Sequence, residues 1–250
     1  MTVVSIILGL IIGSFLNVVI YRLYHGGSIL VSRSICPACR RHLTPWELVP
    51  VLSFVFLRGR CRTCHKKISW QYPVVELTCA LTFGLLALNY QSPVSNVQFW
   101  IQLVFASFLI VIAMFDLKHY LILDKVVWPG IILAAISGIW GGHFVPSLLA
   151  GAGLALFFLL QYLLSQGRWI GLGDVKLGLF LGLVFGWPLT LTCIALAYFS
   201  GAAVGVLLIG LKRKQLSSQL PFGAFLGFSG IIVLIWGPAI TGWYAKLIGL

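Results

Sequence analysis

The sequence is poor in charged residues, and acidic residues are the scarcest of all. Only 9% of the 250 residues are charged, where a soluble domain has about 25%. Asp and Glu together number five, whereas 60% of the residues are hydrophobic and the mean hydropathy is +1.04. A water-soluble fold could not hide this much apolar surface, so we expect the bilayer to surround most of the chain.

The scarcity of acid leaves a strong positive balance, with 17 Lys and Arg and a net charge of +12. Nucleic-acid binding requires a basic soluble face, and no second domain of the sequence offers one. We therefore expect no nucleic-acid partner. Loops on the inner side of a membrane are rich in Lys and Arg, and this explains the positive net charge better. We therefore expect membrane lipids to be partners of the chain.

The first apolar stretch lacks the features of a cleaved signal peptide. Residues 1–20 have no basic segment in front of the apolar run and no small-residue cleavage pattern followed by a polar mature region. We interpret this stretch as a retained first membrane helix.

Apolar runs separated by short polar breaks predict an all-α polytopic membrane protein with about eight transmembrane helices. A full span needs about 20 apolar residues. The run 177–187 is shorter and stops before Pro188, which predicts either a short tilted helix or half of a broken one. We divide the chain into a first helix (1–21), a small polar domain (22–72) and a membrane core (73–250). The expected spans are 3–21, 73–90, 98–115, 126–142, 146–165, 177–187, 189–211 and 222–245.

The basic residues indicate an orientation for these spans. If the N-terminus lies outside and the spans alternate, the inside loops carry all 17 Lys and Arg except Lys246. Segments such as 212–214 and the polar domain 22–72 then lie on the cytoplasmic side. This agreement with the positive-inside rule favours both the helix count and the orientation.

Four of the six cysteines form two CxxC pairs in the polar domain, with 21 residues between the pairs. Two such pairs can complete a tetrahedral site of four thiolates, so we expect a structural zinc ion. His65 is a less favoured alternative ligand, and the reducing cytoplasm argues against disulfides. Cys79 and Cys193 lie in apolar runs, where cysteine behaves as a small hydrophobe, and receive no function. The expected zinc ligands are Cys36, Cys39, Cys61 and Cys64.

Two aspartates are expected at the inner membrane boundary. Asp116 ends the run 98–115, and Asp174 precedes the run 177–187. An ionisable residue at membrane depth usually has a function. Two such carboxyl groups could share one proton, so that the ionised one acts as a base on water and the protonated one as an acid. The structural alternatives are a helix cap for Asp174 and an ordinary interface residue for Asp116.

The other three carboxylates have weaker signals. Asp124 is expected to cap the helix 126–142, and Glu76 to lie near a helix start, where the helix dipole favours it. With Glu47 of the polar domain, they are candidate sites for a basic substrate segment. Gly171 and Gly173, which precede Asp174, are expected to permit unusual backbone angles.

Six motifs follow one another along the chain: 13–22, the two CxxC pairs, 68–76, Asp116, 171–176 and 221–223. Together they resemble the bacterial type IV prepilin peptidases, which are GxGD-class aspartyl proteases. The resemblance implies that Asp116 and Asp174 form the catalytic pair and that the cysteines bind zinc in a cytoplasmic loop. It also implies prepilin or pseudopilin substrates, whose short basic leader is removed at the cytoplasmic face of the bacterial cytoplasmic membrane. Ala224 is a departure, since a second Pro is common there in the family.

Many members of this family also methylate the new N-terminus with S-adenosylmethionine. The sequence has no Rossmann-type glycine fingerprint, so the residues that would bind this cofactor are unknown. The alternative function is a transporter or a zinc-stabilised membrane scaffold. A transporter predicts carboxylates near the bilayer centre and an internal repeat, and the sequence favours neither.

Overall fold

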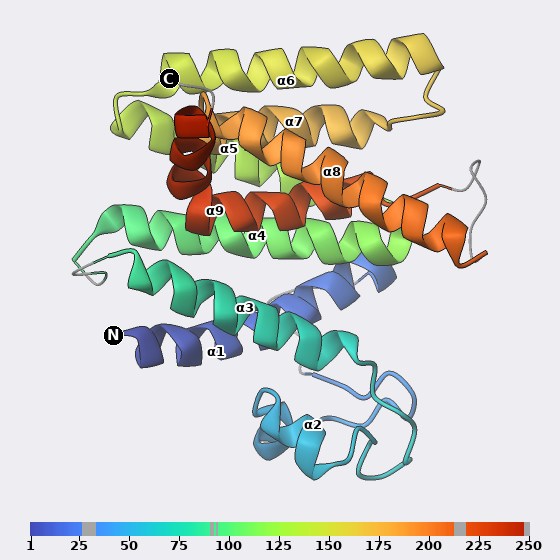
Figure 1. Cartoon of the computed structure of the whole chain (residues 1–250). Coiled ribbons are helices and arrows are strands. Elements are labelled where there is room, and N and C mark those ends of the chain that lie inside the picture. The colour runs from blue at the N-terminus through green and yellow to red at the C-terminus, as the bar shows by residue number, and fades with distance from the viewer. Residues whose placement is uncertain (27–33, 91–92, 94, 213–218, 248–250) are drawn as a thin grey trace. The chain divides into compact units, whose positions relative to one another are not determined.

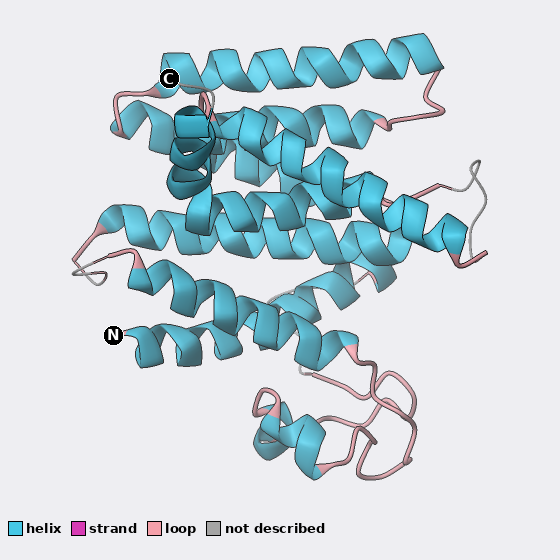
Figure 2. Ribbon diagram, viewed as in Figure 1, coloured by secondary structure: helices cyan, strands magenta, loops and turns pink. Residues whose placement is uncertain are grey.

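The computed structural model describes residues 1–26, 34–90, 93, 95–212 and 219–247. Its regular elements within these ranges are helices, together with two isolated β-bridges (Figures 1 and 2). This confirms the all-α prediction. The chain divides into two compact units, Met1–Ser107 and Phe108–Leu250.

The first unit contains two closely packed helices with a small domain inserted between them. The helices are α1 (Thr2–His25) and α3 (Gln71–Leu88), followed by the first part of α4 (Val97–His119). The inserted segment holds a short 3-10 helix, η1 (Pro45–Leu48), and the short helix α2 (Leu52–Phe56).

Two glycines on α1 explain the close approach of α3. A Cβ atom at Gly9 would lie 2.6 Å from the Cα of Ala80, and one at Gly13 would lie 2.7 Å from the Cα of Glu76. Small residues allow membrane helices to pack backbone against backbone in this way. At the other end of the contact, the buried Asn17 side chain donates to the carbonyl of Tyr72 over 3.1 Å.

The second unit is a bundle around the latter half of α4. Gly151 of α6 lies so close to Gly182 of α7 that a Cβ at Gly182 would be 2.2 Å from the Cα of Gly151. The spacing of Gly178, Gly182 and Gly186 predicts this kind of packing. Helix α8 packs mainly on α9 and hardly touches α6. The helices are α5 (Asp124–Trp140), α6 (Phe144–Ser165), α7 (Leu172–Phe185), α8 (Leu189–Gly210) and α9 (Phe222–Leu247).

The described part of the chain holds eight long helices that correspond to the eight apolar runs, but they differ in length. Among them, α1, α3, α4, α6, α8 and α9 are long and apolar enough to cross a membrane. Helix α5 has 17 residues and α7 only 14, and a 14-residue helix is about 21 Å long. The chain is thus a multi-pass membrane protein with six candidate spans within the described residues, and the count of eight crossings stays a prediction. Arg33, Arg213 and Lys214, used in the orientation argument, lie outside the described residues.

The apolar run 48–57 of the inserted domain does not form a core of its own. Its residues belong to η1, α2 and their flanks, where Val55 is 61% and Phe56 is 81% exposed. Trp46 and Trp70 are also largely exposed on this domain. The sequence leaves two places for this run, packed on the domain itself or at a membrane interface. The exposed side chains fit the interface better, because aromatic residues concentrate there.

Candidate active site and metal centre

Two turns with the same backbone pattern carry the CxxC pairs. In the first, the N–H of Arg40 donates to the carbonyl of Cys36, and Arg40 has a positive φ of 56°. In the second, the N–H of His65 donates to the carbonyl of Cys61, and His65 has a φ of 53°. Each turn is closed by an antiparallel bridge between its flanks. The repetition arises because each CxxC segment must turn both sulfurs to one side.

The four sulfur atoms meet at one point. All four lie within 4.8 Å of one another, and the Sγ atoms of Cys36 and Cys64 are 3.9 Å apart. Four sulfurs around zinc at about 2.3 Å would be separated by about 3.8 Å. The donor set and its dimensions therefore fit zinc. His65 is outside this cluster, so the alternative ligand is not needed.

Hydrogen bonds around the cluster favour the ionised form of one thiol, Cys61, whereas burial and the neighbouring sulfurs raise the pKa of Cys64 to about 11. The backbone N–H groups of Cys64 and Thr63 lower the pKa of the Cys61 thiol to about 6. Nearby, Arg41 donates to Glu47 Oε1 over 2.6 Å, and the N–H and hydroxyl of Thr44 both donate to Oε2 over 2.9 Å. The Arg41 guanidinium and the Thr44 N–H lower the pKa of the Glu47 carboxyl to about 2.

Asp116 is buried near the end of α4 and is held by the start of α9. Its Oδ2 accepts the N–H of Ala224 over 2.8 Å, and the N–H of Gly223 also faces this carboxyl group. The first N–H groups of a helix have no partner within the helix. A carboxylate is stabilised there both by these donors and by the helix dipole.

Asp174 is buried in the first turn of α7 and is held in the corresponding way. Its Oδ2 accepts the N–H of Gly171 over 3.0 Å, so the helix-cap expectation is correct. Its Oδ1 is buried and has no hydrogen-bond partner among the described residues. Asp116 lies near enough to act on Asp174 electrostatically. The structure therefore brings together two buried carboxyl groups, each at a helix N-terminus.

One residue that the sequence analysis missed, Ile122, lies between these two helix starts. A Cβ at Gly173 would be 2.8 Å from the Cβ of Ile122, and a Cβ at Gly223 would be 2.8 Å from its Cδ1 and 3.0 Å from Asp116 Oδ2. The expectation of unusual backbone angles at Gly171 and Gly173 is wrong. Gly171 has an ordinary φ of −89°, and Gly173 lies inside α7. The sequence signal that could have indicated this contact is Gly223. Like Gly173, it lies so close to the Ile122 side chain that only glycine fits there.

The remaining carboxylates each have a protein partner. Asp124 is the first residue of α5, with Leu123 as its N-cap, so the capping prediction for Asp124 is wrong. Its Oδ1 instead accepts Lys176 Nζ over 2.6 Å. Glu76 is buried on α3, where it accepts the N–H of Val51 over 2.7 Å. It therefore links the inserted domain to the membrane helix.

Comparisons with known proteins identify the family of the chain. A family model described as the bacterial peptidase A24 N-terminal domain matches residues 7–90, and one described as the type IV leader peptidase family matches residues 103–206. No solved structure shows a significant match.

Three curated relatives, all named prepilin leader peptidase/N-methyltransferase, are similar over nearly the whole chain. The protein of Pseudomonas putida is 31% identical, with 97% of this chain and 93% of the relative covered. That of Bacillus subtilis is 31% identical, with 96% of each covered. That of Aeromonas hydrophila is 34% identical, with 94% of this chain and 90% of the relative covered.

Proposed function

Because the chain belongs to the type IV leader peptidase family, we propose that it cleaves the short basic leader from prepilins or pseudopilins. The proposed location is the bacterial cytoplasmic membrane, with the N-terminus outside and both the cysteine domain and the active site at the cytoplasmic face. A transporter or scaffold is disfavoured, because the matching family model describes a leader peptidase family and the curated relatives are named as peptidases.

The observation that carries this proposal is the pair Asp116 and Asp174. Both are buried, and they interact electrostatically although 57 positions separate them in the chain. Each has one oxygen fixed by a backbone N–H at a helix start, which orients the carboxyl group without neutralising it. Asp174 Oδ1, which has no hydrogen-bond partner among the described residues, is available to the reacting molecules.

The pair supports acid–base hydrolysis of a peptide bond. Two buried carboxyl groups that repel each other when ionised hold one proton between them. The ionised group takes a proton from water as the water oxygen bonds to the scissile carbonyl carbon, and the protonated group donates to the carbonyl oxygen. The C–N bond then breaks as the amine nitrogen receives a proton. The titration belongs to the pair and not to either residue.

The proposed metal centre has a structural role. The residues that would hold zinc are Cys36, Cys39, Cys61 and Cys64, and a closed site of four cysteines stabilises a fold without binding substrate. Arg41 and Glu47 stiffen the same domain through their ion pair. We assign the chemistry of peptide cleavage to the aspartates alone.

The relatives are named as N-methyltransferases as well as peptidases. We propose methyl transfer as a second function of this chain. S-adenosylmethionine would supply the methyl group to the new N-terminal amine. An apolar groove lies between α6 and α8, but it does not fit this charged ligand. Among the residues that line it, only Thr190, Trp187 and Tyr198 offer polar side-chain atoms. Mass spectrometry of the cleaved pilin, with and without added S-adenosylmethionine, tests the activity by the gain of one methyl group.

The peptidase proposal is tested with purified protein in lipid and a full-length prepilin. Asp116→Asn and Asp174→Asn keep the side-chain shape but remove the acid–base group, so each should lower cleavage by about a thousandfold, within the range that general acid–base catalysis supplies. Asp124→Asn is the matched comparison, because its carboxylate is exposed, ion-paired and outside the dyad: kcat should stay within a few fold of wild type, and loss of a contact with the basic leader would appear in KM alone. Cleavage that survives either dyad change in a folded protein removes the assignment.

A further inference from the structure

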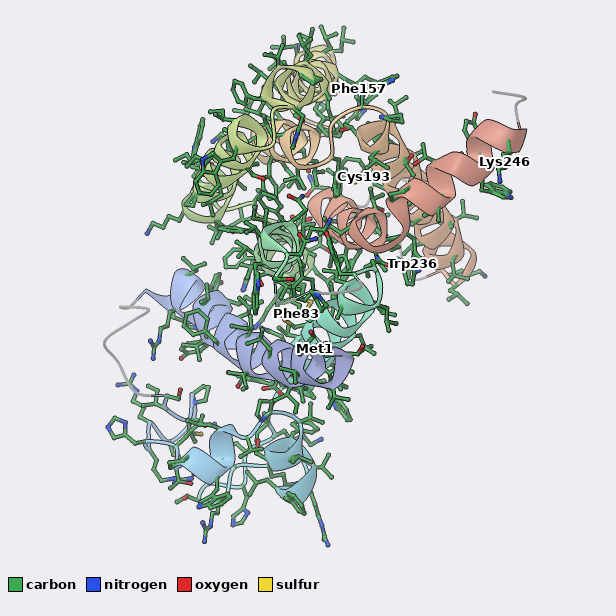
Figure 3. All side chains as sticks on the ribbon, turned by 90° about the vertical axis from the view of Figure 1, so that its left-hand side faces the viewer. Met1, Phe83, Phe157, Cys193, Trp236 and Lys246 are labelled. Atoms are coloured by element: carbon green, nitrogen blue, oxygen red, sulfur yellow. The ribbon has the colours of Figure 1, made fainter. Side chains whose placement is uncertain are left out.

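An apolar groove of about 710 Å³ runs along the second unit between α6 and α8. The groove exists because α6 packs tightly on α7 and α8 packs on α9, while α6 and α8 make few direct contacts. One of these contacts is at the Tyr198 end, where the Tyr198 hydroxyl donates to Gln161 Oε1 over 3.0 Å. Phe157 and Cys193, labelled in Figure 3, mark these two helices. The groove is lined by Pro146, Leu149, Ala150, Gly153, Leu154, Phe157, Trp187, Thr190, Leu191, Ile194, Ala195 and Tyr198.

One end of the groove lies close to the proposed active site. Tyr198 lines this end and lies near enough to Asp174 for an electrostatic interaction. Its ring is 5.0 Å from that of Phe222 between centroids. Phe222 is followed directly by Gly223 and Ala224, whose N–H groups face Asp116. The lining of the groove ends at Tyr198, so the packed rings of Tyr198 and Phe222 stand between the groove and the two carboxyl groups.

We propose that this groove binds the apolar helix of the prepilin substrate, with the helix start at the Tyr198 end and the leader beyond it. The proposal rests on the proposed function, which requires a substrate helix to lie in the membrane with its N-terminal end at the dyad. It deepens that function by assigning the surface that holds the helix during cleavage.

The floor and length of the groove favour a helix over a lipid chain. Small residues from both walls, Ala150, Gly153 and Ala195, line it, and small residues let a second helix approach closely. From Pro146 to Phe157 along α6 the groove extends about 16 Å, or about three turns of a helix. Nothing lies within 4 Å of a Cβ built at Gly153, so this side of the floor is open to a partner.

The open position at Gly153 supplies a direct test. Gly153→Leu fills the groove, and since Leu is a better helix former than Gly, α6 should fold at least as well. Gly210→Leu is the matched control, because Gly210 also has nothing within 4 Å of its Cβ but does not line the groove. Steady-state cleavage of full-length prepilin in lipid should show a KM raised about tenfold in Gly153→Leu with kcat within about twofold. Gly210→Leu should leave both constants as in wild type.

Photo-crosslinking identifies the occupant independently of rate. A photoreactive amino acid replaces Leu191, an exposed groove residue, or Leu207, an exposed residue of α8 outside the groove. In an Asp116→Asn background with prepilin present, Leu191 should crosslink to the apolar segment of the prepilin and Leu207 should not. Crosslinks from Leu191 to phospholipid alone, or to a second copy of this chain, overturn the proposal.

The outcomes separate the groove from the peptidase function. If wild type cleaves prepilin but Gly153→Leu has an unchanged KM and no groove crosslink forms, the groove proposal is wrong and the peptidase proposal stands. If wild type does not cleave prepilin at all, the proposed function fails first, and the groove proposal falls with it.

Discussion

The two glycines that precede Asp174 should differ sharply in their tolerance of alanine. At Gly173 an added Cβ would be 2.8 Å from the Cβ of Ile122, which is an atom fixed by the backbone and unable to rotate away. At Gly171 the nearest atom to an added Cβ is 3.6 Å away, an ordinary contact, and the φ of −89° suits alanine. Gly173→Ala must therefore move either Ile122 or the start of α7.

The expected size of the effect follows from this clash. Overpacking by a methyl group costs about 2 kcal/mol, which corresponds to about thirtyfold if it falls on the arrangement of the dyad in the transition state. We expect Gly173→Ala to lower kcat/KM for prepilin about thirtyfold, and Gly171→Ala to stay within about threefold of wild type.

The assay is cleavage of full-length prepilin in lipid, with thermal unfolding of each variant as a control for folding. Ile122→Gly removes the opposing Cβ. The double variant Gly173→Ala, Ile122→Gly should therefore lose less kcat/KM than the product of the losses in the two single variants. Equal impairment of Gly171→Ala and Gly173→Ala, in proteins that unfold at the wild-type temperature, would refute the steric reasoning.

Two further predictions concern the inserted domain. Cys61→Ser should lose bound zinc and lower the melting temperature of the domain, because structural zinc binding contributes about 10 kcal/mol or more to such folds; metal analysis of the purified protein checks this, with Cys193→Ser as a buried control that keeps the metal. At pH values above about 5, Glu47→Gln should lower the melting temperature by a few degrees. The difference in melting temperature between this variant and wild type should become smaller as the pH falls. The reason is that the pKa of Glu47 is about 2 in the folded domain and about 4.3 when unfolded, so its stabilisation is lost as the pH falls through this window; a constant gap would contradict it.

The helices were predictable because the membrane leaves few alternatives. A chain that crosses lipid must satisfy its backbone internally, so each long apolar run becomes a helix. The exception was α7, which begins at Leu172 and not near 177. Its first turn is polar because Asp174 caps it, and a polar turn is hard to distinguish from a loop in sequence alone.

The candidate site was predictable in its parts but not in its assembly. The spacing of the cysteines predicted their cluster, and the ends of two apolar runs predicted a pair of aspartates, since these are local properties of the sequence. The common depth of the aspartates in the membrane stays a prediction. The contact of Ile122 with Gly173 and Gly223 is tertiary, and so is the open groove between α6 and α8. A glycine in a sequence shows that space is needed, without showing whether a backbone angle or a neighbouring side chain needs it.

The packing of α1 on α3 has a consequence for the domain inserted between them. Since Gly9 and Gly13 hold these helices in backbone contact, the two ends of the intervening segment are fixed before that segment folds. Closing a chain of 45 residues, 26–70, costs about 3 kcal/mol in chain entropy by the logarithmic rule. In the intact protein the packing of the two membrane helices offsets this loss of chain entropy. The four thiols are therefore held at a higher effective concentration than in a free segment. The intact protein should therefore bind its metal more tightly than the excised segment, by up to about a hundredfold.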